Sequence, residues 1–80
     1  MRIDKFLKNA RIIKRRTTAK EACDQGRVSI NDRVSKAGDE VKIGDNVQIN
    51  FASGSMRFRV VDIKENPKKE EATTLYENID

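Results

Sequence analysis

The first ten residues carry apolar side chains at the spacing of an α-helix. Apolar residues recur at positions i, i+3, i+4 and i+7, which lie on one stripe of a helix: Ile3, Phe6, Leu7 and Ala10. The cations Arg2 and Lys5 fall on another side. The pattern predicts a short helix with one apolar face and one basic face.

A second short helix is predicted to begin near residue 18 and to end at Gly26. Thr18 followed three residues later by Glu21 matches a capping box, and glycine commonly terminates a helix. A narrow stripe of small residues lies between these signals: Ala19, Ala22 and Cys23. Small side chains allow two helices to approach closely, so we expect a compact pair.

From Val28 the apolar period changes from about 3.6 to 2, which is typical of β-strands. Asn31 and Asp32 have the turn chemistry of a hairpin. Extended segments are expected over residues 28–30, 33–35, 41–43, 47–51 and 56–63. The alternation slips between Val60 and Val61, which predicts a bulge or a strand buried on both faces.

Residues 66–80 have no sustained apolar face and are mostly polar or charged. We expect a flexible polar tail there and one domain over residues 1–65. The predicted fold is α+β: two short N-terminal helices packed on a small, mainly antiparallel β-sheet, followed by the tail.

Composition narrows the possible functions of these 80 residues. The chain contains no histidine or tryptophan and a single cysteine, which cannot form an internal disulfide. This indicates a reducing, cytoplasmic setting. No signal-peptide pattern opens the chain, and no apolar run approaches the roughly 20 residues that cross a bilayer. We therefore expect no membrane association.

The net charge of +4 is distributed unevenly along the chain. Residues 1–36 carry a net charge of +7, residues 37–65 carry −1 and residues 66–80 carry −2. A purely solubilising charge is usually interspersed by sign, so this segregation favours a polyanionic partner.

The densest cluster of cations lies between the two predicted helices. Arg11, Lys14, Arg15 and Arg16 precede the expected start of the second helix, where the helix dipole favours anions over cations. A phosphate backbone would supply the missing negative charge. Nine residues are our RNA-binding candidates: Arg2, Lys5, Arg11, Lys14, Arg15, Arg16, Thr17, Lys20 and Arg27.

Two of these candidates have a second interpretation. Thr17 can cap the second helix or donate to a phosphate, and Arg27 can neutralise the end of that helix or contact RNA. Arg2, Arg15 and Arg16 are the strongest candidates, because a guanidinium grips a phosphate with a planar fork. The three phenylalanines fall on apolar stripes, so we expect Phe6, Phe51 and Phe58 in the core.

The residues predict no enzymatic activity and no bound cofactor or metal. No histidine is present to activate Cys23, whose neighbours at positions 21 and 24 are acidic. The adjacent carboxylates Asp39 and Glu40 lack further ligands and are interpreted as solvated charge.

The run RIDKFLKNARIIKRRTTAKEACDQGRVSINDRV, residues 2–34, resembles the S4-type (alpha-L motif) RNA-binding domain. The spacing, the charge and the glycine agree together, and a single short domain of this type fits residues 1–65. The chain shows no attached catalytic domain, and in this it resembles the small stand-alone, ribosome-binding members of the family. These include a bacterial heat-shock protein and a factor of ribosome-associated quality control.

That resemblance implies specific partners. It implies association with the large ribosomal subunit, with its rRNA and with peptidyl-tRNA, in support of a partner factor that adds alanine to stalled nascent chains. Subunit recycling or assembly is an alternative ribosomal role. Outside the family, the basic face can belong to a protein-interaction adaptor or bind an anionic membrane. We expect the free protein to be a monomer.

Overall fold

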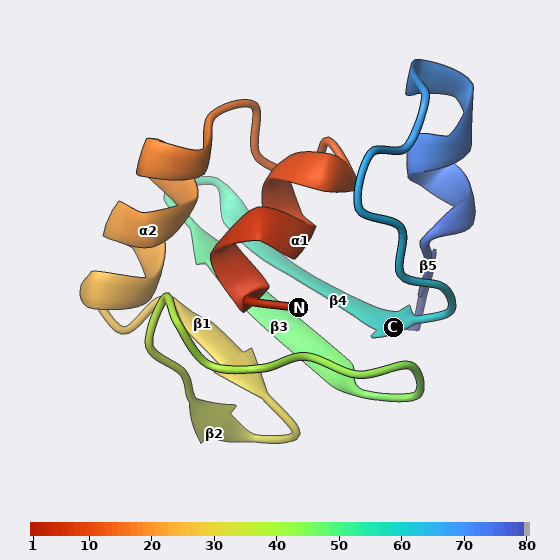
Figure 1. Cartoon of the computed structure of the whole chain (residues 1–80). Helices are drawn as coiled ribbons and strands as arrows, with labels where there is room; N and C mark the ends of the chain where they lie inside the picture. Colours follow the sequence, from red (N-terminus) through yellow and green to blue (C-terminus); the bar gives the residue numbers. More distant parts are fainter. Residues whose placement is uncertain (80) are drawn as a thin grey trace.

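The computed structural model describes residues 1–79 (Figure 1). Two α-helices open the chain, and five strands and a 3-10 helix follow. The elements are α1 (Ile3–Asn9), α2 (Arg16–Asp24), β1 (Val28–Ile30), β2 (Arg33–Val34), β3 (Asn46–Phe51), β4 (Gly54–Val60), η1 (Lys69–Thr74) and β5 (Tyr76–Asn78). The α+β class expected from the sequence is confirmed.

The strands form one sheet in the order β2-β1-β3-β4-β5, and every neighbouring pair is antiparallel. The helices α1 and α2 pack on one face of this sheet (Figure 1). In the long pair β3–β4, Val47 lies opposite Phe58 and Ile49 opposite Met56. Alternation along each strand therefore directs one set of side chains toward the helices and leaves the other face of the sheet to polar residues.

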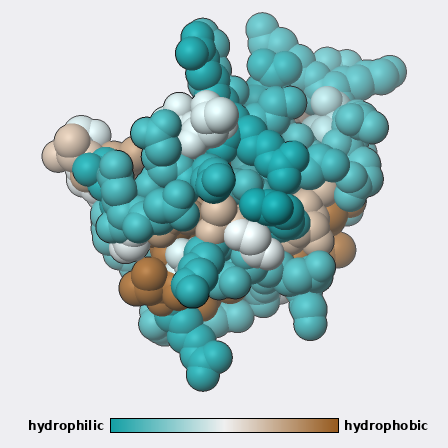
Figure 2. All heavy atoms as spheres, turned by 60° about the vertical axis from the view of Figure 1, so that its left-hand side comes forward, coloured by the Kyte–Doolittle hydropathy of each residue, from teal (hydrophilic) through white to brown (hydrophobic). Residues whose placement is uncertain are grey.

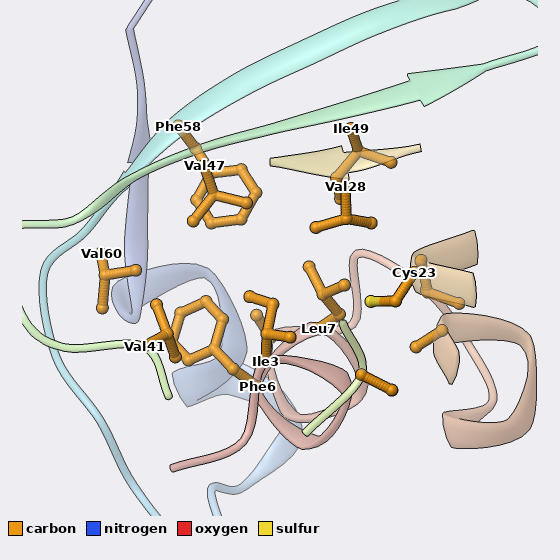
Figure 3. Close-up of a cluster of buried hydrophobic side chains, with 14 of the residues drawn as sticks. Ile3, Phe6, Leu7, Cys23, Val28, Val41, Val47, Ile49, Phe58 and Val60 are labelled. Atoms are coloured by element: carbon orange, nitrogen blue, oxygen red, sulfur yellow. The ribbon is translucent and has the colours of Figure 1, made fainter. Parts of the chain in front are cut away.

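The core lies between α1 and the sheet (Figure 3). Ile3, Phe6 and Leu7 are fully buried, as the helical spacing predicted. The rings of Phe6 and Phe58 are stacked with centroids 6.1 Å apart, so helix and sheet meet through an aromatic pair. This contact fixes the orientation of α1, and with it the directions in which the polar side chains of the helix project.

Local turn chemistry positions the second helix and the first hairpin. Gly26 has φ +74°, and its N–H donates to the carbonyl of Cys23 while the N–H of Arg27 donates to Ala22. This pair of bonds is a Schellman motif, so the glycine stop is confirmed. Asn31 and Asp32 both have positive φ, as a two-residue type I′ hairpin turn requires.

The segment before β3 differs from the expected strand over residues 41–43. Val41 is buried and its N–H donates to the carbonyl of Met1, but Ile43 is 62% exposed and lies in a turn region. The only pairing here within residues 1–79 is an isolated bridge between Glu40 and Arg2. A two-residue alternation is too short to specify a strand where no neighbouring strand is available.

The expectation of a flexible tail is wrong for residues 66–79, and position 80 lies outside the described residues. Strand β5 pairs with β4, Leu75 is fully buried, and the ring of Tyr76 meets Phe58 edge-on at 5.3 Å. The packed unit therefore does not end at residue 65. The outer edge of β4 offers unpaired backbone groups, and β5 satisfies them.

The slip in apolar alternation marks the end of β4. The N–H groups of Val61 and Asp62 both donate to the carbonyl of Leu75, at 2.8 and 3.2 Å. Two residues facing one is the pairing of a bulge, as the sequence predicted.

No helix among residues 1–79 has the length and apolar character that a membrane crossing requires.

Candidate nucleic-acid interface

The loop between α1 and α2 is anchored by its apolar residues and displays its charged ones. The N–H of Ile13 donates to the carbonyl of Leu7 at 3.2 Å, and its side chain is 7% exposed. Lys14 and Arg15 follow directly and are exposed. The loop therefore holds the two cations on a fixed backbone.

Arg11 begins this loop in the left-handed region, with φ +57°. Its N–H donates to the carbonyl of Lys8, and the N–H of Ile12 donates to Leu7, so α1 ends in the same Schellman motif as α2. The equivalent position of α2 is Gly26. A side chain in this conformation costs roughly 1–2 kcal/mol, so the arginine occupies a position that the backbone would give to glycine.

The start of α2 corrects a prediction. The helix begins at Arg16, with Arg15 as its N-cap, and no side chain caps it. Thr17 and Thr18 lie inside the first turn and are exposed, so the capping box of Thr18 and Glu21 is wrong. The first turn holds no acidic residue. Arg15 and Arg16 thus stand at the positive end of α2 with no acidic residue in its own first turn, which favours an anion from outside the helix.

A buried carboxylate joins the two helices at this end. Asp4 has a side chain only 2% exposed. Its oxygens accept from Nε and Nη2 of Arg2, both at 3.2 Å, and Oδ2 lies 3.5 Å from Nε of Arg16. The two arginine side chains remain 50% and 47% exposed. One negative charge therefore orients two guanidinium groups and leaves one positive charge in excess, with their outer edges open to solvent.

Four of the other predicted cations have three kinds of surroundings. Arg11 and Lys14 line a depression beside the end of α1. Lys20 is exposed one turn after Arg16 on the same side of α2. The ammonium of Lys5 already donates a hydrogen bond to the carboxylate of Glu65, and this bond lowers the pKa of Glu65.

Arg27 is separated from the main cluster. It follows the far end of α2, a nine-residue helix about 13 Å long. There it lines an apolar groove with Ile12, Ala22 and Phe51. The prediction that Phe51 belongs to the core is wrong, because its side chain is 39% exposed at this groove, whereas Phe6 and Phe58 are fully buried.

Sequence reasoning missed three residues of this surface. Asp4 has no predicted role in the sequence analysis, although a carboxylate in the first turn of a helix beside Arg2 is visible in the sequence. Lys8 lies three residues after Lys5 and lines the depression. Asn9 is 7% exposed, and its Nδ2 donates to the carbonyls of Lys64 and Glu65, each at 3.1 Å. No local signal in the sequence reveals that last contact.

The site has no feature of nucleophilic or metal chemistry among residues 1–79. Burial and the nearby carboxylate of Asp4 raise the pKa of Cys23 to about 11, so its thiol stays protonated at neutral pH. No group of three or more potential metal ligands is found in the same range. The face on the side of α2 is mainly hydrophilic (Figure 2), which suits a charged ligand.

Comparison with known families identifies this arrangement. The S4 domain model matches residues 1–47, which include both helices, the loop and the first hairpin. The chain belongs to the S4 domain family. The family resemblance seen in the sequence is thereby confirmed.

Relatives match the chain over nearly its full length. An "RQC P-site tRNA stabilizing factor" of Halalkalibacterium halodurans is 53% identical, covering 96% of this chain and 88% of the relative. A protein of the same name from Bacillus subtilis is 50% identical over 95% of this chain and 88% of its own length. Neither of these names describes an enzyme.

Two solved structures share the whole fold. The trimeric structure of Vibrio cholerae Heat Shock Protein 15 superposes with a TM-score of 0.91 at 26% identity, covering 99% of this chain and 81% of that one. A hypothetical protein solved in solution gives a TM-score of 0.86 at 30% identity, covering 100% and 98%. The S4 chain therefore shares its fold, over nearly its whole length, with proteins of known structure.

Proposed function

We propose that this protein binds the large ribosomal subunit during ribosome-associated quality control, contacting rRNA and the peptidyl-tRNA of the P site. The name shared by its relatives supports a P-site tRNA as the partner. The basic N-terminal half, with a net charge of +7 over residues 1–36, supports RNA over an acidic protein. A protein that binds the ribosome in this way is expected to be located in the cytoplasm.

The observation that carries the proposal is the arginine pair held by Asp4. Arg2 belongs to the start of α1 and Arg16 to the start of α2, yet one buried carboxylate brings their guanidinium groups together. Groups that are already oriented lose less conformational entropy when they grip a phosphate. The pair, with Arg15 beside it, is therefore a prepared phosphate-binding surface.

Recognition by this surface depends on backbone and shape. The rings of Phe6 and Phe58 are buried in the core and cannot stack on bases. A-form RNA presents phosphates and 2′-hydroxyls, which proteins read without base stacking. We therefore expect the protein to recognise a junction or helix geometry of rRNA and tRNA more than a base sequence.

The consequence for the ribosome is stabilisation of a stalled state. A small domain bound to both RNAs lowers the free energy of the complex that retains peptidyl-tRNA. That supports a partner factor while it adds alanine to the nascent chain. Loss of alanine tails in a deletion strain tests this role, and unchanged tails would favour recycling or assembly.

The binding proposal is tested by Arg16→Ala. Binding to purified large subunits is measured over a salt series, and wild-type affinity is expected to fall steeply with salt. Losing one phosphate contact should weaken binding and reduce the slope of log K against log salt by about 1. The fold should persist, because Arg16 is half exposed and Asp4 keeps its hydrogen bonds to Arg2 and to the N–H of Lys5.

Arg57→Ala provides the matched control. Arg57 is exposed on β4 between the inward-facing Met56 and Phe58, so it projects from the opposite face of the sheet. Removing it changes the net charge equally and should leave the slope unchanged. A wild-type affinity that does not vary with salt would contradict RNA binding and favour a protein-interaction adaptor.

A further inference from the structure

A depression beside the C-terminal end of α1 gathers three cations apart from the Asp4 cluster. It is lined by Lys8, Asn9, Arg11, Lys14, Glu65, Asn66 and Pro67. The ion pairs of residues 1–79 leave Lys8, Arg11 and Lys14 without a carboxylate partner. Glu65, the one acidic residue of the lining, is already paired with Lys5.

The wall of this depression is fixed by a buried amide. Asn9 donates from Nδ2 to the carbonyls of Lys64 and Glu65, which ties residues 64–67 to the end of α1 although more than 50 residues separate them. Figure 1 shows this segment running beside the helix. The three cations therefore border a preformed hollow.

The backbone at Arg11 does not explain why an arginine stands there. Its left-handed φ of +57° favours glycine, which occupies the equivalent position after α2. Its side chain is exposed and makes no ion pair within the described part of the chain. The residue keeps a guanidinium at a position where folding alone would prefer no side chain, and such strain is typical of functional sites.

We propose that this depression is a second phosphate-binding subsite, which holds a backbone phosphate of the bound RNA through Arg11, Lys8 and Lys14. The subsite rests on the proposed function but is separate from the pair Arg2 and Arg16. The domain then grips RNA at two points, one at the start of its helices and one at the end of α1. Two fixed points define an orientation on the RNA, which a single cluster does not.

Arg11→Gly separates this role from a structural one. Glycine suits the left-handed backbone, so the midpoint of thermal unfolding should be unchanged or raised. Binding to purified large subunits should nevertheless weaken, with the salt slope reduced by about 1. Arg57→Ala, which removes the same charge on the opposite face, should keep the wild-type slope.

The outcomes distinguish the two proposals. A steep wild-type slope that is reduced by Arg16→Ala but not by Arg11→Gly would overturn the subsite and leave the proposed function standing. Equal reductions for Arg11→Gly and Arg57→Ala would also overturn it, since only total charge would then matter. A flat wild-type response would overturn the proposed function itself.

A second measurement locates the subsite without the ribosome. Inorganic pyrophosphate is titrated into the full chain, and backbone amide signals are followed by NMR. The amides of residues 8–14 and 64–66 should shift in the wild type and should stop shifting in Arg11→Gly. Shifts confined to Arg2, Asp4 and Arg16 in both proteins would contradict a second subsite.

Discussion

At the scale of single residues, the interface depends on Asp4, a negative charge inside a basic surface. Its carboxylate is buried, accepts from Arg2, lies within ion-pair distance of Arg16 and also accepts the N–H of Lys5 at 2.8 Å. A buried carboxylate is tolerated only when it is paired and hydrogen-bonded. Asp4 therefore stabilises the fold and orients the arginines at the same time.

Asp4→Asn tests this double role. The amide nearly matches the carboxylate in shape but removes its charge, so we expect a loss of about 1.5–3 kcal/mol in the free energy of unfolding, as for a hydrogen bond to a charged group. Affinity for large subunits should fall too, because both guanidinium groups become free to move. Urea denaturation and subunit binding measure the two effects.

Asp24→Asn is the control for the first effect. Asp24 is exposed at the end of α2, so its substitution should change unfolding by no more than about 0.5 kcal/mol. If Asp4→Asn bound subunits as tightly as the wild type, preorientation of the arginines would be excluded as the basis of binding.

At the scale of elements, the C-terminal segment is part of the sheet. Strand β5 pairs with β4 through residues 76–78, and η1 carries the buried Ala72 just before it. Neither element has a strong local pattern, so each depends on the edge of β4 and on the apolar site that receives Leu75. The sheet edge supplies the order that the segment lacks by itself.

Leu75→Ala measures that dependence. Leu75 is fully buried, so its truncation leaves a cavity in the core. Such truncations lower the free energy of unfolding by about 2–5 kcal/mol. Thermal or urea unfolding should show a loss of this size. Thr73→Ala, at an exposed position of η1, should have little effect. A wild-type stability for Leu75→Ala would mean that the segment is not packed.

At the scale of the whole molecule, ion pairs link the C-terminal segment to itself and to the helices. Lys5 on α1 bonds Glu65, and Lys64 bonds Glu71 of η1 at 2.7 Å. Hydrogen bonding to Lys64 and to the N–H of Lys68 lowers the pKa of Glu71, and the bond to Glu71 raises the pKa of Lys64. These contacts connect residues 64–71 to α1 and to each other, and their strength depends on pH.

The sign of that dependence follows from the pKa directions. Glu65 and Glu71 have pKa values below their ordinary 4.5 in the folded state, so their contribution to stability is present above pH 4.5 and is lost as pH falls through the folded values. For Lys64 the pKa lies above its ordinary 10.5, so its contribution is present below pH 10.5 and is lost as pH rises through the folded value.

Glu71→Gln tests the acid limb. At pH 7 and low salt the variant should unfold at a slightly lower temperature than the wild type, because it lacks the charged partner of Lys64. At pH 3 the difference between the two should shrink, since the wild-type glutamate is then increasingly protonated. A difference of the same size at both pH values would contradict the pKa assignment.

Local signals in the sequence predicted those parts of the molecule that local forces determine. The stripe of Ile3, Phe6 and Leu7 set the buried face of α1, Gly26 set the end of α2, and the pair Asn31 and Asp32 set the hairpin. Each rests on side-chain periodicity or on a backbone conformation that few residues adopt. The cationic loop was likewise visible, because its four charges fall within six residues of the chain.

What the sequence determined by itself was therefore the binary pattern, the turns and a concentration of positive charge beside two helices. Only the tertiary structure decided which charges meet. Asp4 joins the starts of two helices, Asn9 holds a segment more than 50 residues away, and Leu75 fills a site prepared by the sheet. These contacts join residues distant in the chain, and their energies exist only after the core has brought the partners together.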